Sequence, residues 1–265
     1  MSLPPPHPDS TCLITGASSG IGAEIARELA LRGHGVTLVA RRSDRLEELA
    51  EEVRRRGIRA EVLACDVTDA AARGRLLEQV ADLGLEVEVL VNNAGFGTAG
   101  PFVDIDGERE VQMVRTNVEA VVALAHGVAG AMVDRGRGAI LNVASAAVFQ
   151  PIPNQTTYAA SKVFALSFSE ALSSELGSSG ITVTALCPGP VRTEFVEVAE
   201  MEDAAAEAPD FLWISASECA KAGVDGLERG RRVVVPNPAV RAGVELSRYT
   251  PHSILLPLMR RFYPA

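Results

Sequence analysis

Hydrophobic and polar positions follow two patterns that alternate along the chain: short, continuous apolar runs and longer stretches with helical spacing. The apolar runs are rich in Val, Ile, Leu and Ala, which is typical of strands buried on both faces of a parallel sheet. We expect these strands at residues 11–15, 36–40, 59–65, 87–91, 138–145, 181–187 and 232–235. We expect helices at residues 23–32, 45–56, 69–83, 104–134, 158–178 and 217–229. This alternation predicts a three-layer α/β fold with a doubly wound, mainly parallel sheet.

No internal repeat and no break in composition divides the chain. We therefore predict a single domain over residues 1–265, with its core at residues 11–235 and a short helical extension at residues 236–265. The extension combines apolar residues with arginines. Three surroundings remain open for it: the protein's own core, a subunit interface or a membrane surface, of which we favour the first two.

Composition narrows the class of protein. The 265 residues are 47% hydrophobic and 22% charged, as in a globular chain with ample core. The net charge of −9 argues against a nucleic-acid partner. The apolar runs are shorter than the ~18 residues that cross a bilayer, and the proline-rich start lacks the features of a signal peptide, so we expect a cytoplasmic protein without an integral membrane segment. The cysteines and histidines show no ligand spacing, which predicts reduced thiols and no metal.

Candidate chemistry centres on Tyr158 and Lys162, with Ser145 at the end of a predicted strand. Residues four apart on a helix share one face, and ligands of open α/β sheets bind beside the carboxyl ends of the strands. A nearby ammonium lowers the pKa of a phenol from its usual ~10, and a hydroxyl can hold a substrate oxygen while charge develops on it. The three side chains therefore suit hydride transfer to or from a carbonyl, although a Tyr–Lys pair at this spacing also occurs on ordinary helices.

A glycine-rich turn, Gly16-Ala17-Ser18-Ser19-Gly20-Ile21-Gly22, joins the first strand to the first helix. The free N–H groups and the dipole at a helix N-terminus favour phosphate, and glycine lets the backbone approach it closely. The spacing G-x-x-x-G-x-G differs from the G-x-G-x-x-G of many dinucleotide-binding proteins. Because the turn joins a strand to a helix N-terminus, it nevertheless predicts a site for a dinucleotide phosphate.

Arg41 and Arg42 follow the second strand, where NAD-binding folds carry an acidic residue that binds the ribose. Guanidinium groups bind a 2′-phosphate by charge and paired hydrogen bonds, so the arginines predict NADP rather than NAD. Two alternatives stay open: both arginines face solvent, or Asp44 takes the role of the acidic residue. We expect Asp44 instead to cap the helix at residues 45–56.

These motifs occur together and in order: Thr15-Gly-x-x-x-Gly-Ile-Gly, Asn92-Asn93-Ala94-Gly95, and Tyr158-x-x-x-Lys162 with Ser145. The set resembles the short-chain dehydrogenase/reductase family. The resemblance implies a Rossmann-type fold and catalysis by Ser145, Tyr158 and Lys162, with Tyr158 exchanging the proton and Lys162 also binding the nicotinamide ribose. It implies that Asn117 holds a water linking Lys162 to a proton relay, whereas an ordinary surface asparagine is the alternative.

The resemblance also implies where the cofactor lies. Asp66 and Val67 would lie beside the adenine, although Asp66 also suits a simple turn. Pro188, Gly189 and Val191 would close over the nicotinamide, and Thr193 would bind its carboxamide. The full predicted NADP (NADPH) site is Gly16, Ser18, Ser19, Gly20, Ile21, Gly22, Arg41, Arg42, Asp66, Val67, Asn93, Ala94, Gly95, Tyr158, Lys162, Pro188, Gly189, Val191 and Thr193.

Four apolar residues near the catalytic elements form the predicted substrate pocket: Phe96, Ala146, Phe149 and Phe195. They favour a small apolar or acyl-type substrate, although core packing explains the same residues. Residues 194–212 are acidic and rich in alanine without a firm pattern, which is typical of a substrate lid.

The sequence therefore predicts an NADP-dependent oxidoreductase that interconverts a carbonyl and an alcohol on a small molecule. The resemblance implies a homodimer or homotetramer. A catalytically silent nucleotide sensor or scaffold on the same fold is the alternative, but such proteins often lose the Tyr or the Lys. An isomerase or dehydratase of the related extended fold fits less well, because its glycine spacing and larger C-terminal domain are absent. Substrate identity, direction, subunit number and the role of residues 236–265 stay open.

Overall fold

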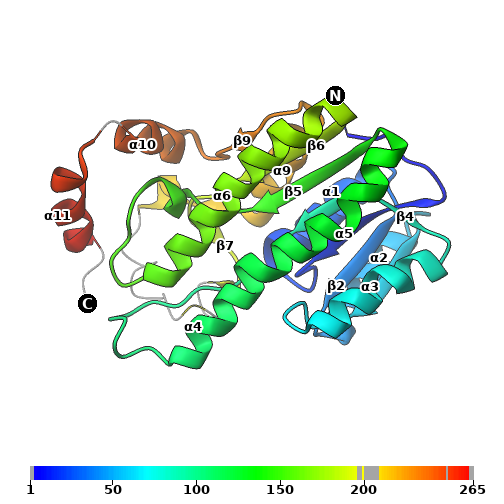
Figure 1. The fold of residues 1–265 in the computed structure, drawn as a ribbon, viewed down its shortest axis with the longest axis horizontal. Coiled ribbons are helices and arrows are strands. Elements are labelled where there is room, and N and C mark those ends of the chain that lie inside the picture. Colours follow the sequence, from blue (N-terminus) through cyan, green and yellow to red (C-terminus); the bar gives the residue numbers. More distant parts are fainter. Residues whose placement is uncertain (1–2, 196–198, 200–208, 249, 263–265) are drawn as a thin grey trace.

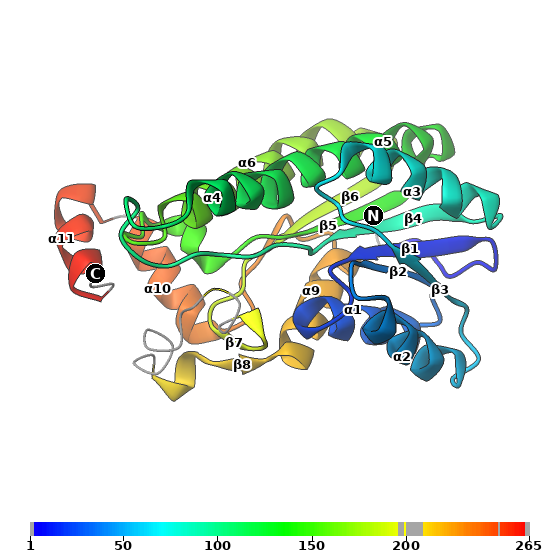
Figure 2. The ribbon, with the colours of Figure 1, turned by 90° about the horizontal axis from the view of Figure 1, so that it is seen from below.

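A seven-stranded sheet with the order β3-β2-β1-β4-β5-β6-β9 forms the centre of the molecule. The computed structural model describes residues 3–195, 199, 209–248 and 250–262. All pairs of neighbouring strands are parallel. Helices α1, α2 and α9 cover one face of the sheet, and α3, α4, α5 and α6 cover the other (Figures 1 and 2). This arrangement confirms the predicted three-layer, doubly wound α/β fold.

The strands begin and end within two residues of their predicted positions. They are β1 (Ser10–Thr15), β2 (Val36–Ala40), β3 (Ala60–Ala64), β4 (Glu86–Asn92), β5 (Gly138–Val143), β6 (Ile181–Leu186) and β9 (Val233–Val234). The sequence did not predict the separate parallel pair β7 (Val191–Arg192) and β8 (Ile214–Ser215), because two residues carry no periodic pattern.

The helices on the two faces are α1 (Gly20–Leu31), α2 (Ser43–Arg54), α3 (Ala70–Asp82), α4 (Gly107–Val114), α5 (Ala120–Arg135), α6 (Thr156–Leu176) and α9 (Ala216–Glu228). The expected cap at Asp44 is wrong, because α2 begins at Ser43 and Asp44 lies inside its first turn. There its charge interacts favourably with the helix dipole. Asp69 does cap a helix: its carboxylate accepts from the N–H groups of Ala71 and Ala72 at the start of α3.

The long helix predicted at residues 104–134 contains a π-helical turn at Arg115–Glu119, between α4 and α5. Such a turn places one extra residue in the helix and often marks a functional site. The sequence analysis did not predict this turn, because no residue type or short motif marks a π-helical turn within a helix. Asn117 lies at its centre.

Within Gly107–Arg135, an 18-residue window has a mean hydropathy of 1.3, so by length and composition alone this run could cross a bilayer. Side chains of this run, such as Leu124 and Val128, pack in the apolar layer between the sheet and α3. Of that 18-residue window, 44% is buried inside the protein.

Alternate residues of each strand enter opposite apolar layers. Ile14 and Val91 pack with α1, α2 and α9, whereas Leu13 and Leu90 pack with α3, α5 and α6. Successive side chains of a strand point to opposite faces, so a strand covered on both sides must be apolar throughout. This burial explains why the strands appear in the sequence as continuous apolar runs.

A chain of buried amides crosses the sheet at its carboxyl edge. Asn92 and Asn142 are paired in register on β4 and β5, and Asn92 Nδ2 donates to Asn142 Oδ1 at 2.9 Å. Asn142 Nδ2 donates to Ser169 Oγ at 2.9 Å, and Ser169 Oγ donates to the Ala165 carbonyl of α6 at 2.6 Å. Since the side chains of Asn92, Asn142 and Ser169 are buried, these bonds fix α6 on the sheet.

Two helices form the end of the chain, α10 (Pro238–Arg248) and α11 (His252–Phe262), and they lie beyond the sheet (Figure 1). Val240 of α10 packs against Gly189, where a Cβ would lie 2.6 Å from Val240 Cγ2. Val244, Leu255 and Met259 are buried, whereas Leu246 is 72% exposed. The extension is thus helical, as predicted, and α10 lies against the segment that follows β6.

We expect Asn142→Ala to lower the free energy of unfolding by about 1–3 kcal/mol, because it removes one hydrogen bond each from the buried Asn92 Nδ2 and Ser169 Oγ and breaks the link between β4 and α6. The control is Thr182→Val on β6, since the buried Thr182 Oγ1 has no hydrogen-bond partner among the described residues. That substitution should leave stability unchanged or raised. Urea denaturation of both variants measures the difference, and equal losses would contradict this account of the amide chain.

Candidate active site

Tyr158 and Lys162 lie on one face of α6, beside the carboxyl end of β5, as their spacing predicted. Their exposed fractions are 8% and 6%. Lys162 Nζ lies 5.9 Å from the centre of the Tyr158 ring and donates a hydrogen bond to the Val143 carbonyl at 3.0 Å. The amine is therefore held next to the phenol by the last residue of a strand.

Burial lowers the pKa of Lys162 from 10.5 to about 8, and the neighbouring Cys187 partly opposes this change. Burial penalises the charged form of an amine because it removes the ammonium from water. At neutral pH the ammonium still predominates. An ammonium in a dry site acts more strongly on a neighbouring group than one in water.

Asn117 is buried in the π-helical turn and joins three elements. Its Nδ2 donates to the Phe96 carbonyl and to Ser161 Oγ, both at 3.0 Å, and its Oδ1 accepts from the Phe96 N–H at 3.3 Å. Ser161 Oγ donates to the Tyr158 carbonyl at 2.7 Å. The alternative of a surface asparagine is wrong, since the exposed fraction is 1%. The role in a water-mediated relay stays a prediction.

Ser145 follows β5 and begins a 3-10 turn at Ala146–Phe149, in which its Oγ accepts from the Ala147 N–H at 3.1 Å. The Ala146 N–H donates to the Pro188 carbonyl at 2.7 Å. Ser145 therefore stands between the end of β5 and the segment at Pro188–Gly189, where two strand ends meet.

The glycine-rich turn packs tightly against the end of β4. Asn93 Nδ2 donates to the carbonyls of Thr15 and Gly16 at 2.9 and 3.1 Å. A Cβ on Gly16 (φ +66°) would lie 2.8 Å from that Nδ2, and one on Gly22 would lie 2.3 Å from it. These two glycines are therefore required for packing against Asn93, in addition to any approach of a phosphate.

Gly95 lies beside the side chains of Asn117 and Lys162. A Cβ there would lie 2.8 Å from Asn117 Oδ1 and 3.2 Å from Lys162 Nζ. Only a glycine leaves this space without displacing one of the two side chains. The Asn-Asn-Ala-Gly motif thus links the glycine-rich turn to Asn117 and Lys162.

Arg42 reaches across the glycine-rich turn. Its guanidinium donates to Ser18 Oγ at 3.0 Å and Ser19 Oγ at 2.9 Å, and it forms an ion pair with Glu194 at 3.1 Å. Arg41 is exposed and acts on Asp66 through its charge. Burial raises the pKa of Asp66, but hydrogen bonds from Thr68 and the charge of Arg41 outweigh it, so the pKa is lowered.

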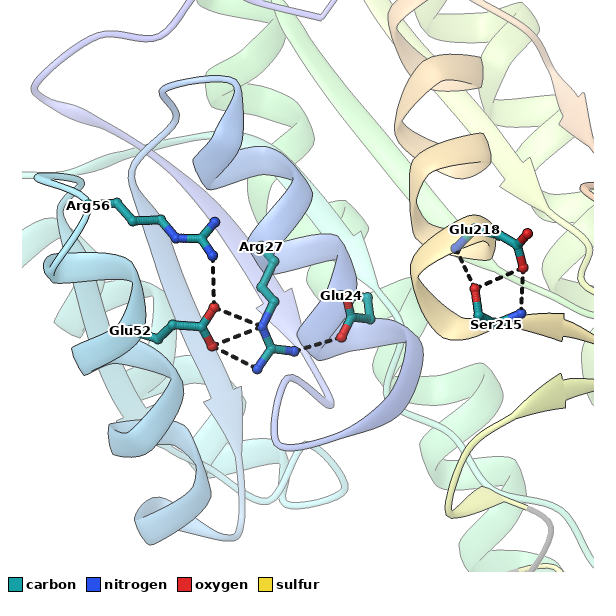
Figure 3. Close-up of polar contacts among 6 residues, drawn as sticks. All are labelled: Glu24, Arg27, Glu52, Arg56, Ser215 and Glu218. Carbon is teal, nitrogen blue, oxygen red and sulfur yellow. Dashed lines mark hydrogen bonds and ion pairs between the residues drawn. The ribbon is translucent and has the colours of Figure 1, made fainter.

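Beside this turn, between α1 and α2, lies an open cavity of about 510 Å³. Arg27 of α1 holds Glu52 of α2 with two hydrogen bonds from Nε, 3.2 and 2.9 Å long, and donates to Glu24 at 2.7 Å (Figure 3). The hydrogen bond from Arg27 lowers the pKa of Glu52. Figure 3 also shows the capping box of Ser215 and Glu218 that begins α9. The cavity between α1 and α2 is also lined by Ser18, Ser19 and Glu194.

Two of the four predicted pocket residues lie next to Tyr158. Phe195 packs on Tyr158 with ring centres 5.7 Å apart, and Phe96 joins the same apolar cluster. Phe149 packs elsewhere, against the cluster that contains Cys187, and Ala146 lies in the turn after Ser145. Most of the predicted lid lies outside the described residues, namely 196–198 and 200–208.

Sequence reasoning missed two groups of residues around the site. Met113 and Ile152 are buried beside Tyr158, and Glu194 pairs with Arg42. Glu194 is 152 residues from Arg42, so no local pattern indicates the ion pair. Helical spacing places Met113 on a buried face but cannot show which side chain it meets.

A family model described as "short chain dehydrogenase" matches residues 10–203. A short chain dehydrogenase of Pseudocercospora fijiensis is 37% identical over 69% of this chain, and this match spans 60% of that protein's length. A very-long-chain 3-oxoacyl-CoA reductase of Anas platyrhynchos is 36% identical over 71% of this chain and 62% of its own length. The chain therefore belongs to the short-chain dehydrogenase/reductase family.

Solved structures agree with this assignment. A short-chain dehydrogenase from Sphingobium yanoikuyae in complex with NADPH superposes with a TM-score of 0.81 and is 36% identical. The superposition covers 89% of this chain and 91% of that one. The similarity extends over the Rossmann-type sheet and both helix layers, so the family resemblance seen in the motifs is confirmed.

Lys162→Met should stabilise the protein at neutral pH, because burial of the ammonium costs on the order of 3 kcal/mol. The folded-state pKa lies below that of the unfolded chain, so the unfolded chain binds more protons between about pH 8 and 10.5. The penalty is therefore complete below pH 8 and fades as the pH rises. We expect a melting temperature several degrees above wild type at pH 7 and a smaller gain at pH 9.5, measured by calorimetry. A gain that grows with pH would contradict the assignment.

Proposed function

We propose that this protein is an NADP-dependent oxidoreductase that interconverts a carbonyl and an alcohol. The observation that carries the proposal is the buried pair on α6, with Lys162 Nζ 5.9 Å from the Tyr158 ring and held by the Val143 carbonyl. A bound nicotinamide supplies or accepts the hydride in this chemistry. The residues around the pair handle the proton and the developing charge.

In the direction of reduction, the Ser145 hydroxyl donates a hydrogen bond to the carbonyl oxygen of the substrate, and Tyr158 gives that oxygen a proton. Lys162 favours the phenolate that Tyr158 leaves, and its ammonium also binds a ribose hydroxyl of the cofactor. A water held by Asn117 would link Lys162 to a proton relay, through which Tyr158 regains its proton from solvent. The apolar surroundings, including Phe96 and Phe195, exclude bulk water and strengthen these interactions.

The residues present fit a dinucleotide with a 2′-phosphate. The carboxylate of Glu194 already occupies a group of donors formed by Arg42 and Ser19, so this place accepts an anion. Helix α1 begins at Gly20 without an acidic residue in its first turn, which suits a diphosphate at Gly16–Gly22. The other contacts in this proposal are the adenine at Asp66 and Val67, the cleft wall at Asn93, Ala94 and Gly95, and the nicotinamide at Pro188, Gly189, Val191 and Thr193.

For the substrate we propose a small apolar or acyl-type carbonyl compound. The cluster around Tyr158 is apolar, with Phe96, Met113 and Phe195 among its members. Arg192 does not point to an acidic substrate, because it pairs with Asp210 and stacks on Trp213. The 3-oxoacyl-CoA reductase among the relatives supports an acyl substrate. We place Ala146, in the turn after Ser145, at the edge of the substrate pocket. We further propose a cytoplasmic homodimer or homotetramer.

Tyr158→Phe tests the catalytic assignment. Loss of the proton donor should lower kcat for reduction of a 3-oxoacyl ester by about 10²–10⁴-fold, whereas the dissociation constant for NADPH stays within about twofold. NADPH absorbance follows turnover, and calorimetry follows binding. Equal turnover in both proteins would remove Tyr158 from the mechanism, and binding without turnover in either would favour the sensor.

Arg41→Asp tests the choice of cofactor. Replacing a guanidinium near the 2′-phosphate by a carboxylate should weaken NADPH binding roughly 10- to 100-fold and leave NADH binding little changed. Titration of wild type and variant with both nucleotides measures the ratio. A wild-type protein that already prefers NADH would show that the two arginines do not select NADP.

A further inference from the structure

The donors beside the glycine-rich turn hold one of the chain's own carboxylates. Both terminal nitrogens of Arg42 lie 3.1 Å from Glu194 Oε2, while the same guanidinium donates to Ser18 and Ser19. The hydrogen bond from Arg42 lowers the pKa of Glu194, and hydrogen bonding to Ser19 and the charge of Arg45 act in the same direction. The Arg42 guanidinium and the Ser19 hydroxyl therefore hold one carboxylate, and the charge of Arg45 also favours its ionised form.

Glu194 reaches this place because its segment crosses the glycine-rich turn. Thr193 lies against the turn, since a Cβ on Gly20 would lie 3.2 Å from Thr193 Cγ2. The next residue, Phe195, packs its ring on Tyr158. Three consecutive residues thus have three different partners: Thr193 contacts the glycine-rich turn, Glu194 pairs with Arg42, and Phe195 packs on Tyr158.

We propose that Glu194 competes with the 2′-phosphate of NADP for Arg42, so that binding of the phosphate displaces Glu194 and moves the segment that carries Phe195. The proposal rests on the function proposed above and names the residue that opposes NADP binding at its site. A phosphate and a carboxylate cannot share one guanidinium face, and the phosphate carries more charge and more acceptor oxygens. NAD lacks this group and leaves the ion pair intact.

The ion pair between Glu194 and Arg42 is weak enough to be displaced. The side chains of Arg42 and Glu194 are 47% and 41% exposed, and ion pairs at such exposure contribute little to stability. A 2′-phosphate can therefore replace Glu194, which a deeply buried ion pair would resist. When Glu194 is displaced, the adjacent Phe195 moves with it, so binding of the 2′-phosphate changes the packing on Tyr158.

Binding of nucleotide fragments tests the competition without any turnover. Calorimetry would compare adenosine 2′,5′-bisphosphate with adenosine 5′-monophosphate in wild type, Glu194→Gln and Glu24→Gln. Glu24 is the matched control, because it lines the same cavity but pairs with Arg27. We expect Glu194→Gln to tighten binding of the bisphosphate about three- to tenfold, to change the monophosphate less than twofold, and Glu24→Gln to change neither.

Trp213, the one tryptophan of the chain, reports on the segment, since it stacks on Arg192 with 5.4 Å to the ring centre. Its emission should change more with the bisphosphate than with the monophosphate, and this difference should shrink in Glu194→Gln. Unchanged or weaker bisphosphate binding in Glu194→Gln, or equal responses of Trp213 to both nucleotides in wild type, would overturn the proposal. Absent carbonyl reduction would instead overturn the proposed reaction, because these measurements need no substrate.

Discussion

The buried ammonium of Lys162 is the constraint on which the rest of the site depends. Burial disfavours its charge and lowers its pKa to about 8, yet the Val143 carbonyl holds it beside Tyr158. Burying a charge lowers the free energy of unfolding, and other contacts in the fold must offset this loss. The two extensive apolar layers on the faces of the central sheet provide this stabilisation.

Position matters as much as charge, because a proton donor must be held within a fraction of an ångström. Two buried polar connections fix α6, which carries both Tyr158 and Lys162. The amides of Asn92 and Asn142 join the sheet to Ser169, and Asn117 in the π-helical turn joins the end of β4 to Ser161. Both connections place satisfied polar groups where an apolar core would allow the helix to shift.

The contacts beside the glycine-rich turn are of a different kind. The ion pair between Arg42 and Glu194 is half exposed, so water screens it and its partners can exchange. Weak, exchangeable contacts suit a place where a charged ligand must enter, whereas the buried contacts around Lys162 suit a place where chemistry requires fixed geometry. The proposed NADP site therefore combines rigid contacts at Tyr158 with exchangeable contacts at Arg42.

The sequence by itself determined the strands of the central sheet, the three-layer arrangement and the central pair of Tyr158 and Lys162, because these depend on local periodicity and on spacing within one helix. Only the tertiary structure decided which distant residues meet: Asn93 against Gly16 and Gly22, Asn117 against Phe96, and Glu194 against Arg42. It also separated Phe149 from Phe96 and Phe195, although all are apolar and near the motifs. Periodicity shows which face of an element is buried, but contacts between elements depend on how those faces pack, and no short stretch of sequence encodes that.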